Sequence, residues 1–254
     1  MPPDFQRIGL REKLILTGLY LSKFDSVGLY KLGFENFKEA FNAIGYGLGS
    51  RPASIKNYRD EFDPLFPNLR QGWHKRQRRE YCLEIYEKYK DLDLETFSAL
   101  IKSFVGYDEN ALSAIESTEE KKDGEAIFAK RLITGLAAEH YFEAVQPKLQ
   151  ELMNFTVENT TRLGCGYDFR LSPKTSGEFL AVEVKGLQEK TGSVALTPKE
   201  YDVASALSER FILFVVKNFR DVPFHEVYRN PISSSLKFTC KKRTIVQVSW
   251  AATI

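Results

Sequence analysis

The sequence lacks the features that mark secreted and membrane-inserted proteins. It does not open with a basic segment followed by an apolar stretch and small residues, and no apolar run approaches the roughly 18 to 20 residues that span a bilayer. The chain of 254 residues has three cysteines, Cys82, Cys165 and Cys240, and their wide spacing provides no CxxC pair for zinc or redox chemistry. We therefore expect reduced thiols in a cytoplasmic protein that does not enter a membrane.

Several common catalytic motifs are missing as well. The histidines, His74, His140 and His225, form neither an HNH nor an HExxH pattern, and no GxSxG sequence marks a serine nucleophile. The glycine-rich segment GYGLGSRP precedes no GK[ST] and follows no expected strand, so we interpret it as a flexible turn rather than a phosphate-binding loop.

What the sequence does contain favours two globular domains. Apolar residues make up 43% of the chain, enough to bury real cores, and its length lies between one large domain and two ordinary ones. The polar segment 106–124 predicts a linker between them. The formal net charge of +2 identifies no partner, but basic residues cluster in RQGWHKRQRR, residues 70–79.

Residues 1–105 are predicted to form an all-helical domain. Apolar side chains recur at helical spacing over 11–24, 34–44, 76–90 and 93–105. The segment RPASIKNYRDEF predicts a further short helix with Ile55, Tyr58 and Phe62 inward. A short helix after a glycine-containing turn and before a basic stretch resembles a helix-turn-helix reader of DNA. An ordinary amphipathic helix in a bundle is the alternative.

We expect this helix and the basic run to bind DNA. Arginine and asparagine make bidentate contacts to guanine and adenine, which favours Arg59 and Asn57 as base readers, whereas the basic run would contact phosphates. A solvated helix face is the alternative for the run. The predicted DNA-binding residues are Ser54, Lys56, Asn57, Arg59, Arg70, Lys75, Arg76, Arg78 and Arg79.

Residues 125–254 are predicted to form a second domain of the α/β (α+β) class around a central mixed sheet. A long helix starts near Glu125 and is interrupted near Pro147, and the pattern after Asn154 becomes strand, strand, helix, strand. The run FILFVV, residues 211–216, is apolar on both faces, as in a strand covered on both sides. Strand, helix and strand then form a parallel crossover.

The stretch GYDFRLSPKTSGEFLAVEVKG predicts a β-hairpin that turns at SPKTSG. Because strand side chains alternate between faces, Glu183 and Lys185 share a face, and Asp168 joins them if the register is right. Downstream, Thr197 and Glu200 fit a capping box around Pro198, so we assign them to starting a helix and not to chemistry.

Asp168, a short gap and then Glu183-Val184-Lys185 resemble the active-site signature of the PD-(D/E)XK nucleases. More narrowly, GYDF, EFLAVEVKG and ALTPKEYDVASAL, followed by an apolar strand, resemble the nuclease-like domain at the C-terminus of the plant protein NO VEIN, which also occurs in bacterial defence proteins. The resemblance covers about residues 130–220. Tyr167 stands where the superfamily's name has proline, which removes no ligand.

The resemblance implies a restriction-endonuclease-like core and a Mg²⁺ ion, with Mn²⁺ able to substitute. Asp168, Glu183 and the Val184 carbonyl oxygen would bind the metal, and Asp168, Glu183, Lys185 and Glu139 would be catalytic, with Glu143 as the alternative to Glu139. Lys185 would orient or deprotonate the attacking water or stabilise transition-state charge. An ordinary surface ion-pair cluster is the alternative to a catalytic site.

These expectations describe a metal-dependent endodeoxyribonuclease of the restriction type that cleaves double-stranded DNA. Cutting both strands favours a homodimer, and a restriction system would include a cognate methyltransferase. Two alternatives stay open: a structure-directed repair or recombination nuclease, and a DNA-binding module whose nuclease-like domain no longer cuts.

Overall fold

A computed structural model describes residues 8–105 and 123–240, with side chains in the second stretch from Lys130 onward. The predicted linker, 106–124, lies outside the described residues except for its last two positions. In the two described stretches, no helix is both long enough and apolar enough to cross a bilayer.

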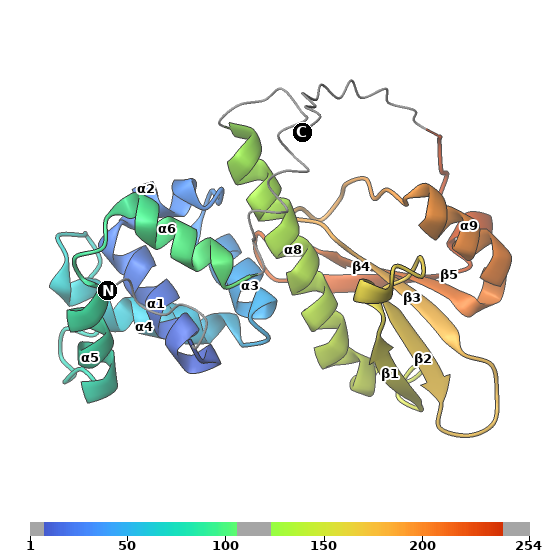
Figure 1. The fold of residues 1–254 in the computed structure, drawn as a ribbon, viewed down its shortest axis with the longest axis horizontal. Coiled ribbons are helices and arrows are strands. Elements are labelled where there is room, and N and C mark those ends of the chain that lie inside the picture. Colours follow the sequence, from blue (N-terminus) through green and yellow to red (C-terminus); the bar gives the residue numbers. More distant parts are fainter. Residues whose placement is uncertain (1–7, 106–122, 241–254) are drawn as a thin grey trace, which may run out of the picture.

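The N-terminal part is helical, as predicted (Figure 1). Two details differ from the prediction: a helix that was not expected follows the first one, and the predicted helix 76–90 begins only at Glu80, so the basic run is a loop rather than a helix face. The helices are α1 (Leu10–Lys23), α2 (Asp25–Lys31), α3 (Phe37–Gly47), α4 (Pro52–Phe62), α5 (Glu80–Tyr89) and α6 (Leu94–Ser103).

Helix α1 lies at the centre of this part. Every residue from Leu14 to Ser22 is buried, because α4 packs along one side of α1 and α5 and α6 contact it elsewhere. Gly18 permits the close crossing with α4, since a Cβ atom there would lie 2.5 Å from Cβ of Tyr58. The first core is therefore built around α1.

The C-terminal part is a five-stranded mixed sheet in the order β1-β2-β3-β4-β5. Only β3 and β4 run parallel, and the other neighbouring strands are antiparallel, which confirms the predicted hairpin, crossover and fold class. The strands are β1 (Phe155–Asn159), β2 (Phe169–Pro173), β3 (Leu180–Gly186), β4 (Phe211–Lys217) and β5 (Phe224–Arg229).

Helices cover both faces of the sheet. Helix α8 (Asp123–Val145) packs on one face and ends before Pro147, as predicted, and α9 (Pro198–Leu207) packs on the other. Strand β4 is buried along almost its whole length, with Phe214 toward α8 and Phe211 toward α9. The prediction that this apolar run forms a strand covered on both faces is confirmed.

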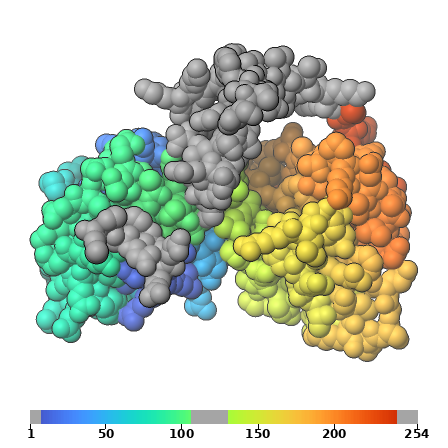
Figure 2. All heavy atoms as spheres, in the orientation of Figure 1, coloured from blue at the N-terminus to red at the C-terminus, as the bar shows by residue number. Residues whose placement is uncertain are grey.

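Helix α8 also joins the sheet to the N-terminal helices, which lie on its far side (Figures 1 and 2). Ile133 belongs to the core around α1, whereas Ala137 and Phe142 belong to the core over the sheet. Helix α3 packs along α8, and Glu39 forms a buried ion pair with Lys130 at 2.8 Å. The two parts of the chain thus share a packed interface.

Candidate active site

The register of the β2–β3 hairpin brings Asp168 beside the end of β3. Phe169 pairs with Val182, so Asp168, one residue before β2, comes opposite Glu183. Its backbone N–H donates to the Val182 carbonyl at 3.0 Å, and its Oδ2 accepts a hydrogen bond from the Val184 N–H at 2.8 Å. The Asp168 carboxylate is therefore hydrogen-bonded to the backbone of β3. The hairpin register that the sequence prediction required is present.

Glu183 and Lys185 share the sheet face that α9 covers, as the alternation predicted. Val182 and Val184 belong to the core beneath α8, so the residues that alternate with them point the other way. The Glu183 side chain is only 3% exposed, and its Oε1 accepts a bond from Lys185 Nζ at 2.5 Å. Asp168, Glu183 and Lys185 thus meet at one end of β3.

Glu200 also reaches this cluster. The capping box predicted for Thr197 and Glu200 is present, with Pro198 in the first turn of α9. In addition, Glu200 Oε2 accepts a hydrogen bond from Lys185 Nζ at 3.0 Å, a contact that was not predicted from the sequence. No spacing in the sequence marks this contact, because it depends on how α9 packs against β3.

Carboxyl groups outnumber basic groups among these contacts. Burial, reinforced by the charge of Asp168, raises the pKa of Glu183 to about 8, although Lys185 opposes the shift. Burial also raises the pKa of Asp168, against the hydrogen bond from Val184 and the charge of Lys185. Burial lowers the pKa of Lys185, but Glu183 and Glu200 outweigh it and the net shift is upward. Lys185 is therefore a cation in this arrangement.

Glu139 of α8 lies within electrostatic reach of the cluster. Burial, followed by the charges of Asp168 and Glu143, raises its pKa to about 7. Glu143, the alternative from the sequence, is exposed. The approach of α8 depends on Gly186, directly after Lys185, where a Cβ atom would lie 2.7 Å from the Thr134 carbonyl oxygen. The backbone of α8 and the backbone at the end of β3 therefore lie in close contact.

The donor set of this cluster suits a hard divalent cation. Among the described residues, no three His, Cys, Asp or Glu side chains are arranged to hold a metal ion by themselves. Mg²⁺ does not need three, because it is commonly bound by one or two carboxylates and keeps several waters. Asp168 and Glu183 supply two carboxylates, and burial is the main cause of their raised pKa values. A bound cation would offset the cost of holding their charge away from water.

Residues 137–229 match the family model described as Protein NO VEIN, C-terminal. The matched segment contains Glu139, Asp168, Glu183, Lys185 and Glu200, and it extends from the middle of α8 through β5. Neither the curated proteins nor the solved structures contain a match to this chain. The resemblance to the nuclease-like NO VEIN C-terminal domain is confirmed for this segment, and the assignment to the PD-(D/E)XK nucleases stays a prediction.

The helix predicted to read bases is present as α4, but one of its predicted DNA-binding side chains points into the protein. Lys56 and Asn57 are exposed and Ser54 is half-buried, whereas Arg59 is only 8% exposed. Arg59 follows Ile55 by four residues and therefore shares its inward face. Its guanidinium bonds to Asp60 at 2.7 Å and lies over the rings of Phe37 and Phe41. The predicted base-reading role of Arg59 requires an exposed side chain, whereas the Arg59 side chain is buried.

Two arginines of the basic run, which lies outside the segment that matches the NO VEIN family model, form ion pairs with carboxylates of the helical part. Arg70 bonds to Asp63 through Nε at 3.0 Å and Nη2 at 2.9 Å. Arg79 bonds to Glu61 through Nε at 2.8 Å. Arg78 is half-buried, and Lys75 and Arg76 are exposed. The run is thus a loop held by carboxylates at the end of α4 rather than one solvated face.

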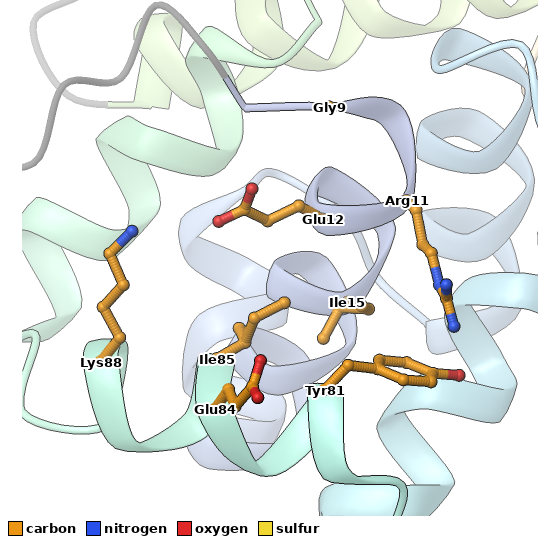
Figure 3. Close-up of a pocket in the computed structure, with 8 residues that line it drawn as sticks. All are labelled: Gly9, Arg11, Glu12, Ile15, Tyr81, Glu84, Ile85 and Lys88. Atoms are coloured by element: carbon orange, nitrogen blue, oxygen red, sulfur yellow. The ribbon is translucent and has the colours of Figure 1, made fainter.

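The described hollows lie apart from the motif. A shallow pocket of about 440 Å³ lies between α1 and α5, where the Arg11 guanidinium covers the Tyr81 ring at 3.7 Å (Figure 3). A second hollow of about 400 Å³ at the β2–β3 turn is lined in part by Arg170, Phe179 and Arg210. Neither contains Asp168, Glu183 or Lys185.

Proposed function

We propose that this chain is a magnesium-dependent nuclease that hydrolyses phosphodiester bonds of double-stranded DNA, with Mn²⁺ able to substitute. The observation that carries the proposal is the meeting of Asp168, Glu183 and Lys185 on one face of β3, in a buried position where carboxylates outnumber the lysine. The match of residues 137–229 to a family associated with nuclease-like domains supports it.

Each residue has a defined part in this proposal. A divalent cation bound by Asp168, Glu183 and the Val184 carbonyl oxygen would supply charge neutralisation and water activation for phosphodiester hydrolysis. Lys185, kept as a cation by its carboxylate partners, would stabilise the charge that develops on the phosphate. Glu139, with a pKa of about 7, can take up or release a proton at its carboxyl group near neutral pH.

The test is cleavage of supercoiled plasmid and linear duplex in Mg²⁺, in Mn²⁺ and in EDTA. We expect cleavage in either metal and none in EDTA. Asp168→Ala, Glu183→Gln and Lys185→Met should each lose it while the far-UV circular dichroism spectrum is unchanged. Glu178→Ala, an exposed glutamate of the same hairpin, serves as the matched control and should cut like the parent. Full magnesium-dependent activity in Asp168→Ala would overturn the proposal.

The finer assignment that we propose is a restriction endonuclease that acts as a homodimer beside a cognate methyltransferase. A restriction enzyme should cut unmodified duplex at a fixed sequence and spare DNA methylated by its partner. A repair or recombination nuclease would instead prefer branched or nicked substrates to plain duplex. Binding of duplex without any cleavage would identify an inactive DNA-binding module.

A further inference from the structure

Lys185 has two carboxylate partners that come from different elements. Glu183 on the same strand contacts Nζ at 2.5 Å, and Glu200 at the start of α9 contacts it at 3.0 Å. Under the proposed function, Glu183 also binds the divalent cation. A carboxylate that binds a cation has less charge left for the lysine, and the cation itself repels the ammonium group. Lys185 then needs its second partner.

The Glu200 side chain is already oriented toward Lys185 by the start of α9. Its Oε2 accepts the Thr197 N–H at 2.9 Å, which orients the side chain as part of the capping box. The Glu200 side chain is 16% exposed and the Lys185 side chain 23%, so solvent screens their attraction only in part. Little side-chain entropy is lost when Lys185 bonds to a carboxylate that the helix start already orients.

We propose that Glu200 is a positioning residue: it holds Lys185 in the site and thereby leaves Glu183 available to the divalent cation. The inference rests on the proposed function for the identity of the site, but it concerns a residue that was predicted from the sequence only to cap a helix. Without the charge of Glu200, Lys185 keeps Glu183 as its charged partner, and a cation must compete with that ion pair.

The experiment compares Glu200→Gln with Thr197→Ala. Glutamine keeps the capping box, which accepts Glu or Gln, but removes the charge from Lys185. Thr197→Ala removes the cap and leaves the Glu200 carboxylate in place. The measurements are Mn²⁺ affinity by isothermal titration calorimetry, kcat and KM for plasmid cleavage, and thermal unfolding, all on the full chain.

We expect Glu200→Gln to weaken Mn²⁺ binding or lower kcat by about 10- to 100-fold, the usual range for partners of metal-site residues, with KM for DNA unchanged. Thr197→Ala should keep both values and lower only Tm, by about 2–4 °C for the loss of a cap in a chain of this size. Equal Mn²⁺ affinity and kcat in Glu200→Gln and the parent would overturn the inference.

The two proposals fail in distinguishable ways. If the parent cleaves DNA and Glu200→Gln matches it in every measurement, the positioning role is wrong and the nuclease function stands. If the parent cuts no DNA but Glu200→Gln still weakens Mn²⁺ binding relative to Thr197→Ala, the positioning role stands and the nuclease function is wrong. A parent chain that binds no Mn²⁺ overturns the positioning role.

Discussion

Buried carboxylates in the helical part of the molecule are fully partnered. Glu61, 1% exposed, accepts bonds from the backbone and the guanidinium of Arg79. Asp63, also 1% exposed, accepts two bonds from Arg70 and one from the Ser22 hydroxyl. Such pairs satisfy the charges that folding removes from water. Their arginines stabilise the loop between α4 and α5.

The carboxylates at the end of β3 have fewer basic partners than those of the helical part. Glu183 and Glu200 share Lys185, and Asp168 bonds to a backbone N–H. The pKa values of Asp168 and Glu183 rise there, whereas hydrogen bonds from Lys56 and Arg59 outweigh burial and lower the pKa of Asp60 in α4. The carboxylates of the helical part are thus paired with arginines, whereas two carboxylates at the end of β3 share one lysine. Under the proposed function, a divalent cation would complete this second cluster.

The largest expected effect is the loss of stability in Asp63→Asn. The variant removes the charge opposite Arg70, and breaking a buried ion pair by removing one partner costs about 3 kcal/mol or more. Urea denaturation followed by circular dichroism measures the change. The control is Asp202→Asn, an exposed acid on α9, which should unfold like the parent. An Asp63→Asn variant as stable as the parent would show that these arginines are not structural.

The same substitution at the motif should act in the opposite direction. Asp168→Asn keeps an oxygen for the Val184 N–H and removes one of the crowded charges, so without divalent cations we expect stabilisation of about 0.5–2 kcal/mol, together with loss of cleavage. The measurement is urea denaturation in EDTA, with the Asp63→Asn variant measured under the same conditions for comparison. Destabilisation by Asp168→Asn as large as that by Asp63→Asn would remove the electrostatic contrast.

The contrast should also appear as a pH dependence. The pKa of Glu183 is about 8 in the folded state, above its ordinary value of 4.5, so the folded state holds a proton that the unfolded state releases between these values. The free energy of unfolding should therefore fall as pH rises through that interval. Glu183→Gln should flatten the fall in EDTA, whereas Glu178→Gln should not. A parent slope retained in Glu183→Gln would contradict the assignment.

The smallest stability effects are expected at the exposed end of the basic loop. Lys75→Ala and Arg76→Ala should change the free energy of unfolding by no more than about 0.5 kcal/mol. If this loop contacts phosphates, each should lower the salt dependence of DNA binding by about one unit of slope. Arg70→Ala should instead lose stability. Fluorescence anisotropy across a salt series measures the slope, and unchanged slopes would place the DNA elsewhere.

The sequence predicted the strands that the core covers and missed those at the sheet edges. Strands β2, β3 and β4 carry regular apolar positions because helices bury one or both faces. Strand β1 is mostly exposed, and Phe224 and Val227 of β5 are 38% and 40% exposed. Edge strands of this kind lack the alternation that makes a strand recognisable.

The motif could be predicted because it depends on local geometry. Glu183 and Lys185 share a face through strand periodicity, and Asp168 joins them through one hairpin register. Glu200 and Arg59 could not be assigned in the same way. The contact of Glu200 with Lys185 depends on the packing of α9, and the burial of Arg59 depends on Phe37 and Phe41 of another helix.

The double role of α8 has a consequence for how this protein can be divided. Ile133 faces the helical core and Phe142 the core over the sheet, so a fragment starting at residue 123 would expose an apolar stripe to water. Exposed apolar patches promote aggregation. A soluble fragment for biochemistry would therefore need polar substitutions at Ile133 and Leu136, or would have to retain α3 as its cover.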